Sequence, residues 1–169
     1  MIKRNLSKVI LTIALFLAST TFYSTTFYSA APPALSSVSC HTANLYYEAR
    51  GESKAGMKAV AAVVINRKNS GKYPKNDCMV IFQNRQFSWT QQQKFKDIQK
   101  LLQGDTAGLS TKDRQAYQQA VIIAQTPDKE LLKALPKGTL WYHAKYTKPR
   151  WSEKMKLVKV VGQHKFYVG

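Results

Sequence analysis

Acidic side chains are scarce in this sequence, which has nine Asp and Glu against 26 Lys and Arg and a formal net charge of +17. Lys3, Arg4 and Lys8 contribute three of these positive charges, and no acid lies in the first 31 residues. A surface so rich in positive charge attracts polyanions such as nucleic acid, an anionic membrane or an anionic cell wall. The imbalance therefore indicates an anionic partner.

Cysteine and histidine are also rare. The two cysteines, Cys40 and Cys78, are too few for a structural zinc site unless histidines join them. The three histidines, His41, His143 and His164, are scattered and show no paired ligand spacing. We therefore predict no metal site and no cofactor. An even pair of cysteines outside the cytoplasm most economically forms a disulfide, which should stabilise the fold by about 3–4 kcal/mol.

The N-terminal segment has basic residues followed by the uncharged apolar run Val9–Ala18, a pattern typical of an export signal. We expect a signal peptide over residues 1–31, a linker over residues 32–37 and one globular domain over residues 38–169. A cut near Ser19 and an uncleaved membrane anchor are alternatives. Export would place the domain in the periplasm, in the cell wall or outside the cell, with membrane contact only through this segment.

Hydrophobic periodicity predicts helices in the first part of the domain. Val38–Arg50 is predicted as a helix that ends before a glycine, and Ser53 suits the N-cap of an apolar second helix to about residue 68. Ser110 and Asp113 resemble a capping box that opens a third long helix. A short helix over Asp128–Leu135 follows a Thr-Pro pair.

The last part of the chain has the alternation of strands. Leu140–Ala144 is predicted as a strand, and Lys156–Val161 with His164–Val168 as a β-hairpin around Gly162. The segment Gln83–Thr90 is predicted as loop or irregular strand. The expected fold class is α+β, with a helical N-terminal half packed on a small C-terminal antiparallel sheet.

The heptapeptide Tyr-Tyr-Glu-Ala-Arg-Gly-Glu at residues 46–52 holds two of the nine acidic residues. Glu48 is flanked there by Tyr46, Tyr47 and Ala49, and a carboxyl among such neighbours loses hydration and becomes harder to ionise. A carboxylic acid that stays protonated near neutral pH is what cleavage of a glycosidic bond requires. The heptapeptide therefore predicts cleavage of a carbohydrate.

The run YYEARGESKAGMKAVAAVVINR at Tyr46–Arg67 resembles the opening motif of the SleB/CwlJ-type cell-wall hydrolases, which include spore-cortex-lytic enzymes. Further similarities follow in the family's order: YP…C (Tyr73, Pro74, Cys78), QFSWT (Gln86–Thr90), WYHAKYTKPRW (Trp141–Trp151) and GQHKFY (Gly162–Tyr167). Several separated motifs in one order are a specific signal. The resemblance extends from Cys40 to the C-terminus and implies a lytic-transglycosylase-like fold.

The resemblance implies cleavage of the peptidoglycan glycan strand between N-acetylmuramic acid and N-acetylglucosamine, by a lytic transglycosylase whose one essential glutamate matches Glu48. Protonated Glu48 would donate to the glycosidic oxygen, and its carboxylate would then accept a proton from the C6 hydroxyl as a 1,6-anhydro ring closes. One alternative is a muramidase that uses water and a second carboxylate such as Glu52. We expect Glu52 instead to support the site, near a helix N-terminus or beside Arg67.

Sugar rings stack on aromatic side chains, so Phe87, Trp89, Tyr142 and Trp151 are candidate walls of a glycan groove. Ser88 and His143 could hydrogen-bond to acetamido or hydroxyl groups of the sugar. For each aromatic residue, core packing is an equal alternative. The predicted substrate-binding residues are Phe87, Ser88, Trp89, Tyr142, His143 and Trp151.

A basic patch of Lys145, Lys148 and Arg150 alternates with Tyr146 and Trp151 and is expected to face the anionic wall. The same pattern is found in proteins that bind single-stranded nucleic acid, but export argues against that partner. The expected partner is peptidoglycan, bound by a monomer. A second alternative is a non-catalytic, cationic wall-binding or membrane-active protein.

Overall fold

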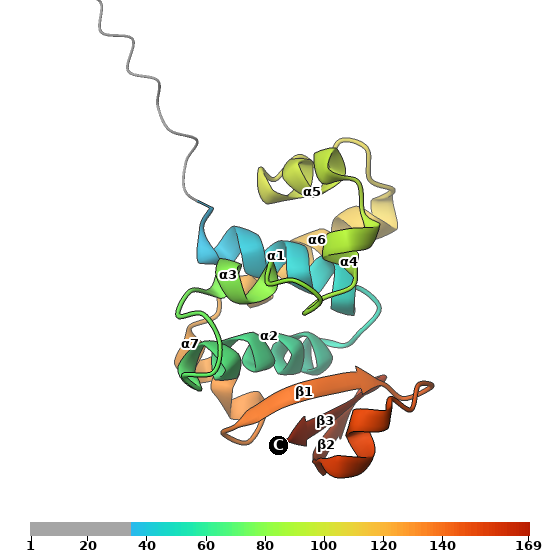
Figure 1. Ribbon diagram of the computed structural model, residues 1–169. Coiled ribbons are helices and arrows are strands. Elements are labelled where there is room, and N and C mark those ends of the chain that lie inside the picture. Colours follow the sequence, from blue (N-terminus) through green and yellow to red (C-terminus); the bar gives the residue numbers. More distant parts are fainter. Residues whose placement is uncertain (1–34) are drawn as a thin grey trace, which may run out of the picture. The chain divides into compact units, whose positions relative to one another are not determined.

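The computed structural model describes residues 35–169, which fold as helices packed on a small antiparallel sheet (Figure 1). This is the α+β fold class predicted from the sequence. The predicted signal peptide and the first part of the linker lie outside the described residues. Within residues 35–169, no helix is both long and apolar enough to cross a membrane.

Two long helices form the N-terminal part of the domain, as predicted. Helix α1 spans Ser37–Ala49 and helix α2 spans Lys54–Asn69. The Ser36 and Ser53 side chains cap them by accepting hydrogen bonds from backbone N–H groups in their first turns. Helix α2 is buried along most of its length because it is apolar nearly all round, and it lies between α1 and the sheet (Figure 1).

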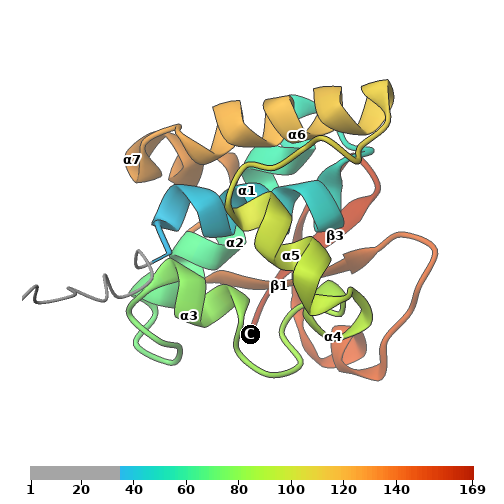
Figure 2. The same ribbon diagram turned by 90° about the horizontal axis from the view of Figure 1, so that it is seen from above.

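Further helices surround this pair. They are α3 (Asp77–Ile81), α4 (Trp89–Gln92), α5 (Phe95–Leu102), α6 (Thr111–Ala124), α7 (Asp128–Leu131) and the 3-10 turn η1 (Leu132–Ala134). Helix α6 begins at the predicted cap Ser110, whereas α5 was not predicted. Helix α5 lies on the side of α1 away from the sheet (Figures 1 and 2). The end of the segment predicted as loop or irregular strand forms α4.

The sheet has three antiparallel strands in the order β1-β3-β2. Strand β1 spans Thr139–Ala144, and β2 (Lys156–Val161) and β3 (His164–Val168) form the predicted hairpin. A 3-10 turn, η2 (Arg150–Lys154), lies between β1 and β2. Phe166 of β3 is fully buried and packs into the core that α1, α2 and α6 form, so the sheet and the helices share one core.

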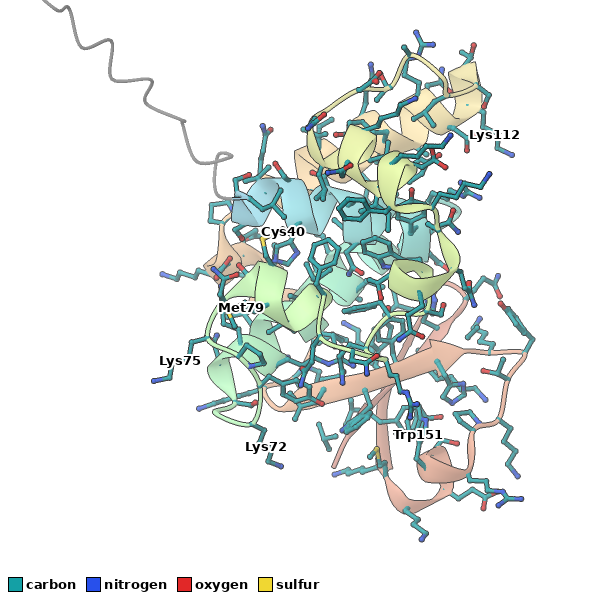
Figure 3. All side chains as sticks on the ribbon, turned by 45° about the horizontal axis from the view of Figure 1, so that its top comes forward. Cys40, Lys72, Lys75, Met79, Lys112 and Trp151 are labelled. Carbon is teal, nitrogen blue, oxygen red and sulfur yellow. A yellow bond between two sulfur atoms is a disulfide. The ribbon has the colours of Figure 1, made fainter. Side chains whose placement is uncertain are left out.

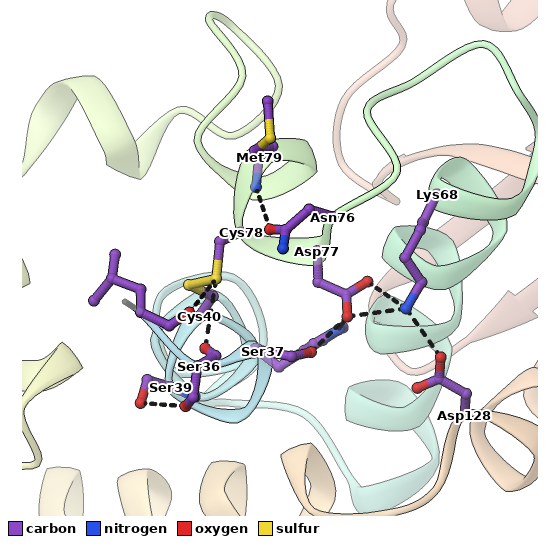
Figure 4. A network of polar contacts seen from close by, with 12 residues as sticks. Ser36, Ser37, Ser39, Cys40, Lys68, Asn76, Asp77, Cys78, Met79 and Asp128 are labelled. Carbon is purple, nitrogen blue, oxygen red and sulfur yellow. Dashed lines mark hydrogen bonds and ion pairs between the residues drawn. A yellow bond between two sulfur atoms is a disulfide. The ribbon is translucent and has the colours of Figure 1, made fainter. Parts of the chain in front are cut away.

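The predicted disulfide between Cys40 and Cys78 is present and joins α1 to α3. A polar network lies next to it (Figure 4). Asp77, which is 5% exposed, accepts hydrogen bonds from Ser37 and Lys68, and Lys68 also contacts Asp128 at 3.0 Å. Burial alone would raise the pKa of Asp77, but the His41 imidazole 3.7 Å away and the hydrogen bonds from Ser37 and Lys68 outweigh it and hold the pKa well below its usual range.

Candidate active site

Glu48 lies in the last turn of α1, where its side chain is half-buried. Its Oε2 accepts a hydrogen bond of 2.8 Å from the hydroxyl of Tyr142 on β1. The Tyr142 ring packs against Phe166 at 5.6 Å between ring centroids and edge-to-face against His164 at 5.2 Å. The phenol that contacts the carboxylate is therefore held in place by two residues of β3.

The surroundings of Glu48 favour its protonated form. Burial raises the pKa of the Glu48 carboxyl, while the hydrogen bond from Tyr142 and the positive charge of Arg67 partly oppose the shift. The net direction is upward, as predicted from the sequence. A carboxyl in such surroundings can act as a general acid, and the two groups that stabilise its ionised form remain in place after it has given up its proton.

Arg67 lies on α2 and is 4% exposed. Its Nε donates a hydrogen bond of 2.9 Å to the carbonyl of Leu140, and its guanidinium lies over the rings of Tyr73 and Phe87 at 5.4 and 5.3 Å from their centroids. Its Nη1 makes no hydrogen bond to any described residue. Arg67 thus brings a fixed positive charge close to Glu48 and holds the start of β1 on α2.

Glu52 joins the beginning of α2 to the turn between β2 and β3. Its side chain is 7% exposed, and its two oxygens accept the backbone N–H of Gln163 at 3.0 and 3.2 Å. A Cβ on Gly56 would lie 2.8 Å from Glu52 Oε2, and one on Gly162 would clash with the same atom. The Glu52 carboxylate thus lies between Gly162 of the turn and Gly56 of α2. Both positions favour glycine because a larger residue would crowd this carboxylate.

The sequence placed Glu52 near the N-terminus of the second helix or beside Arg67. In the structure Glu52 has the first of these positions, directly before the N-cap Ser53 of α2. Among the described residues, however, no ion pair joins Glu52 to Arg67, and its neighbour is His164, whose Nδ1 is 3.4 Å from Oε1. Burial lowers the pKa of His164 and favours the neutral imidazole, so this contact is weaker than a salt bridge.

The remaining predicted site residues of β1 are divided between the two faces of the sheet. Side chains alternate along a strand, so Tyr142 points to the helices while Trp141 and His143 point to the opposite face. Trp151 of η2 packs there at 5.7 Å from Trp141 and 5.5 Å from His143. Tyr142 and Trp151, both predicted as walls of a glycan groove, therefore lie on opposite faces of the sheet, and the predicted hydrogen-bonding residue His143 lies on the face of Trp151.

A model of the cell wall hydrolase family matches residues 51–167. The chain belongs to this family. The matched stretch starts three residues after Glu48, so it includes Glu52, Arg67 and Tyr142 but not Glu48.

Two solved structures are similar to this cell wall hydrolase. The catalytic domain of the germination-specific lytic transglycosylase SleB from Bacillus anthracis is 23% identical with a TM-score of 0.50, and the match covers 81% of this chain and 99% of that one. The catalytic domain of the Bacillus cereus SleB protein is 24% identical with a TM-score of 0.48, over 81% of this chain and 94% of that one. At this identity the likeness to the Bacillus anthracis domain shows the fold. No curated protein gives a significant match.

In this cell wall hydrolase Phe87 and Trp89 belong to the core. They are 2% and 3% exposed, and the Trp89 indole N–H donates a hydrogen bond of 3.0 Å to Asn44 while its ring stacks on Tyr47 at 4.7 Å. Neither ring has a free face for a sugar, so the prediction that both form groove walls is wrong. Ser88 between them is exposed.

A hollow of about 270 Å³ opens next to the last turn of α1 in this hydrolase. Tyr46 and Tyr47, which precede Glu48 in the chain, form one side of it, and residues of α5 and the segment that follows form the other. Its polar lining residues are Arg50, Gln93, Asp97, Lys100 and Asp105. Sequence reasoning missed this hollow because α5 was not predicted. Among residues 35–169, no three His, Cys, Asp or Glu side chains are placed to hold a metal ion.

Proposed function

We propose that this cell wall hydrolase cuts the glycan strand of peptidoglycan between N-acetylmuramic acid and N-acetylglucosamine as a lytic transglycosylase, with Glu48 as its single acid/base. Membership in the family makes the chain a peptidoglycan-cleaving enzyme. The observation that carries the finer proposal is the half-buried Glu48 carboxyl, whose pKa is raised by burial and whose Oε2 is held by Tyr142.

In the proposed reaction, protonated Glu48 donates its proton to the glycosidic oxygen as the bond to the anomeric carbon breaks. The positive charge that develops on the sugar lies near the new carboxylate, which the Tyr142 hydroxyl and the Arg67 charge stabilise. The carboxylate then accepts the proton of the sugar's C6 hydroxyl, whose oxygen bonds to the anomeric carbon. The 1,6-anhydro ring forms without consuming water, and Glu48 ends protonated.

The surroundings of Glu52 argue against the muramidase alternative. A second carboxylate that binds water or forms a covalent intermediate needs an oxygen facing the sugar. Both oxygens of Glu52 instead accept the Gln163 N–H, and the side chain is nearly covered by Gly56 and Gly162. We infer that Glu52 supports the fold next to the site and takes no part in the chemistry.

Substrate contacts are proposed on the helix side of the sheet. The exposed Ser88 hydroxyl and the Tyr142 phenol are candidates for hydrogen bonds to the sugar, and the hollow beside Tyr47 is a candidate for the neighbouring saccharide. We retain the proposals that the chain is exported by a signal over residues 1–31 and acts as a monomer.

The test is digestion of purified peptidoglycan by wild type and by Glu48→Gln, followed by mass spectrometry of the released fragments. We expect fragments with 1,6-anhydro ends from the wild type and at least about a thousandfold less release from the variant. Glu130→Gln, which replaces an exposed carboxylate on α7, is the matched control and should release fragments normally.

Each alternative predicts its own result. Reducing ends that have gained one water would identify a muramidase and contradict the transglycosylase proposal. Undiminished release by Glu48→Gln would remove Glu48 from the mechanism. Wall binding without soluble fragments from any variant would favour the non-catalytic alternative.

A further inference from the structure

The face of the sheet that points away from the helices carries a cluster that the proposed reaction does not use. Tyr167 of β3 and Trp151 of η2 pack on each other at 5.5 Å between centroids, and His143 stacks on Tyr167 at 5.2 Å. The Tyr167 hydroxyl is also 2.8 Å from His143 Nε2. These contacts make a rigid aromatic floor on the side of β1 opposite to Tyr142 and Glu48.

A hollow of about 460 Å³ lies on this floor. Its walls include Lys145, Tyr146, Lys148 and Lys165, and its base includes His143 and Tyr167. Tyr146 is 87% exposed, so its ring lies free at the rim. A concave site with rings below and ammonium groups around it has the chemistry to bind a carboxylate attached to an apolar or sugar chain.

The charge around this hollow is mostly positive, and Glu153 is the one acid among its lining residues. The segment 139–169 has seven basic side chains and a single acid, Glu153. Glu153 contacts Lys148 at 3.1 Å, but both side chains are largely exposed, and an exposed pair of this kind is weak. The ammonium groups of the hollow are thus available to a ligand that brings negative charge.

We propose that this hollow binds the carboxylates of peptidoglycan stem peptides and holds the enzyme on the wall through a surface separate from Glu48. The ligand class rests on the proposed function, since the glycan strand that such an enzyme cuts carries these peptides. Charge complementarity selects an anionic ligand, and the neighbouring rings favour a carboxylate on an organic chain. The sequence predicted a wall-facing basic patch, and the structure adds that it lies on the face of the sheet opposite to the site.

The experiment measures retention on insoluble peptidoglycan from which phosphate-bearing polymers have been stripped. The Glu48→Gln background prevents digestion, so the result does not depend on whether Glu48 is the acid. Lys145→Gln with Lys148→Gln is the test variant. Lys72→Gln with Lys75→Gln is the matched control, because these two exposed lysines lie on the turn after α2, on another part of the surface from Trp151 (Figure 3).

We expect about tenfold weaker retention for the Lys145/Lys148 variant and less than about twofold for the Lys72/Lys75 variant. Removing the stem peptides with an amidase should weaken retention of the parent protein by a similar factor. Tyr146→Ala should also weaken it, because the exposed ring lies at the rim.

If both lysine variants lost the same amount of wall retention, retention would depend only on overall charge, and the proposal would be overturned. Full retention on peptide-free glycan would overturn the carboxylate assignment. Loss of lysis in Glu48→Gln would uphold the proposed function. If wall retention were at the same time unchanged in every lysine variant, the proposed binding site would be refuted.

Discussion

The hydroxyl of Tyr142 donates a hydrogen bond of 2.8 Å to Glu48 Oε2 and so joins the last turn of α1 to β1 across 94 residues of sequence. The burial that raises the pKa of Glu48 and the phenol that opposes this rise act on the same carboxyl. Their balance sets the pH range over which Glu48 holds a proton.

Replacement of Tyr142 by Phe should therefore raise the pKa of Glu48 further, because a hydrogen bond to the ionised form is lost. The protonated acid would persist to higher pH. We expect the alkaline limb of the pH profile of kcat/KM to move upward by about one pH unit, together with a lower maximal rate. The measurement is the release of soluble fragments as a function of pH.

Tyr117→Phe is the control for this prediction. It removes a buried phenol that donates a hydrogen bond of 2.8 Å to the carbonyl of Leu101, away from Glu48. This variant should lose stability but keep the wild-type pH profile. A downward shift of the alkaline limb in Tyr142→Phe, or the same shift in both variants, would contradict the assigned hydrogen bond.

Glu48→Gln should keep or increase the stability of the fold at neutral pH. The pKa of Glu48 is raised on folding, so its contribution to stability is fully present below the unfolded pKa and is lost as pH rises through the folded pKa. Gln has no charge to bury, and its carbonyl still accepts the Tyr142 hydrogen bond. We expect a Tm about 2–4 °C above wild type near neutral pH and no difference below about pH 4.

Thermal unfolding followed by circular dichroism across this pH range tests the prediction. The result also shows that loss of lysis in the variant is not loss of fold. A Tm well below that of the wild type at neutral pH would mean that the carboxylate is a stabilising group and would count against its role as a buried acid.

A side chain at Gly162 should destabilise the fold, because Gly162 has a φ of +55° and an added Cβ would clash with Glu52 Oε2. We expect Gly162→Ala to lower the free energy of unfolding by about 3 kcal/mol. Gly138→Ala is the matched control, since Gly138 also has a positive φ but an added Cβ would meet nothing within 4 Å. It should cost about 1 kcal/mol, from backbone strain alone.

A double-mutant cycle with Glu52→Ala isolates the contact. Once the carboxylate is removed, Gly162→Ala should cost no more than the Gly138 control. Denaturant unfolding of the four variants measures the coupling. Equal costs for Gly162→Ala with and without Glu52 would show that the two residues do not meet.

The sequence predicted the long helices because each buries apolar residues and begins at its own serine cap. It predicted the hairpin because runs rich in valine and aromatic residues lie on both sides of the turn glycine Gly162. Helix α5 was missed although its apolar residues Phe95, Ile98, Leu101 and Leu102 follow a helical period, so the signal was present in the sequence. It spans only eight residues, and the pattern in so short a segment is easily overlooked. Helix α4 has only four residues and depends on its packing rather than on a sequence pattern.

The candidate site was predicted less completely. Glu48 could be singled out from its neighbours and its motif. Its contact with Tyr142, however, depends on where β1 is placed relative to the end of α1, which no local pattern encodes. Trp89 and Trp151 show a different limit, since an aromatic side chain suits a core and a sugar platform equally well. Strand alternation was a usable signal, because it separates Tyr142 from His143 once the strand is predicted.

The final prediction concerns Asp77, whose pKa is held low by hydrogen bonds that outweigh its burial. A group with a lowered folded pKa contributes stability that is present above its unfolded pKa and is lost as pH falls through the folded pKa. We therefore expect Asp77→Asn to lower the free energy of unfolding by about 2 kcal/mol near neutral pH, where Lys68 loses a charged partner. The deficit relative to the wild type should shrink as pH falls below about 4.

Urea unfolding at several pH values measures this deficit. Asp128→Asn is the control, because Asp128 contacts the same Lys68 nitrogen at 3.0 Å but is more than half exposed. Solvent screens that pair, so the control should cost less than about 0.5 kcal/mol at every pH. The two variants are expected to differ in their free energy of unfolding because Asp77 is buried beside the disulfide, whereas Asp128 is exposed. Equal costs for both would mean that Asp77 acts only as one more surface charge.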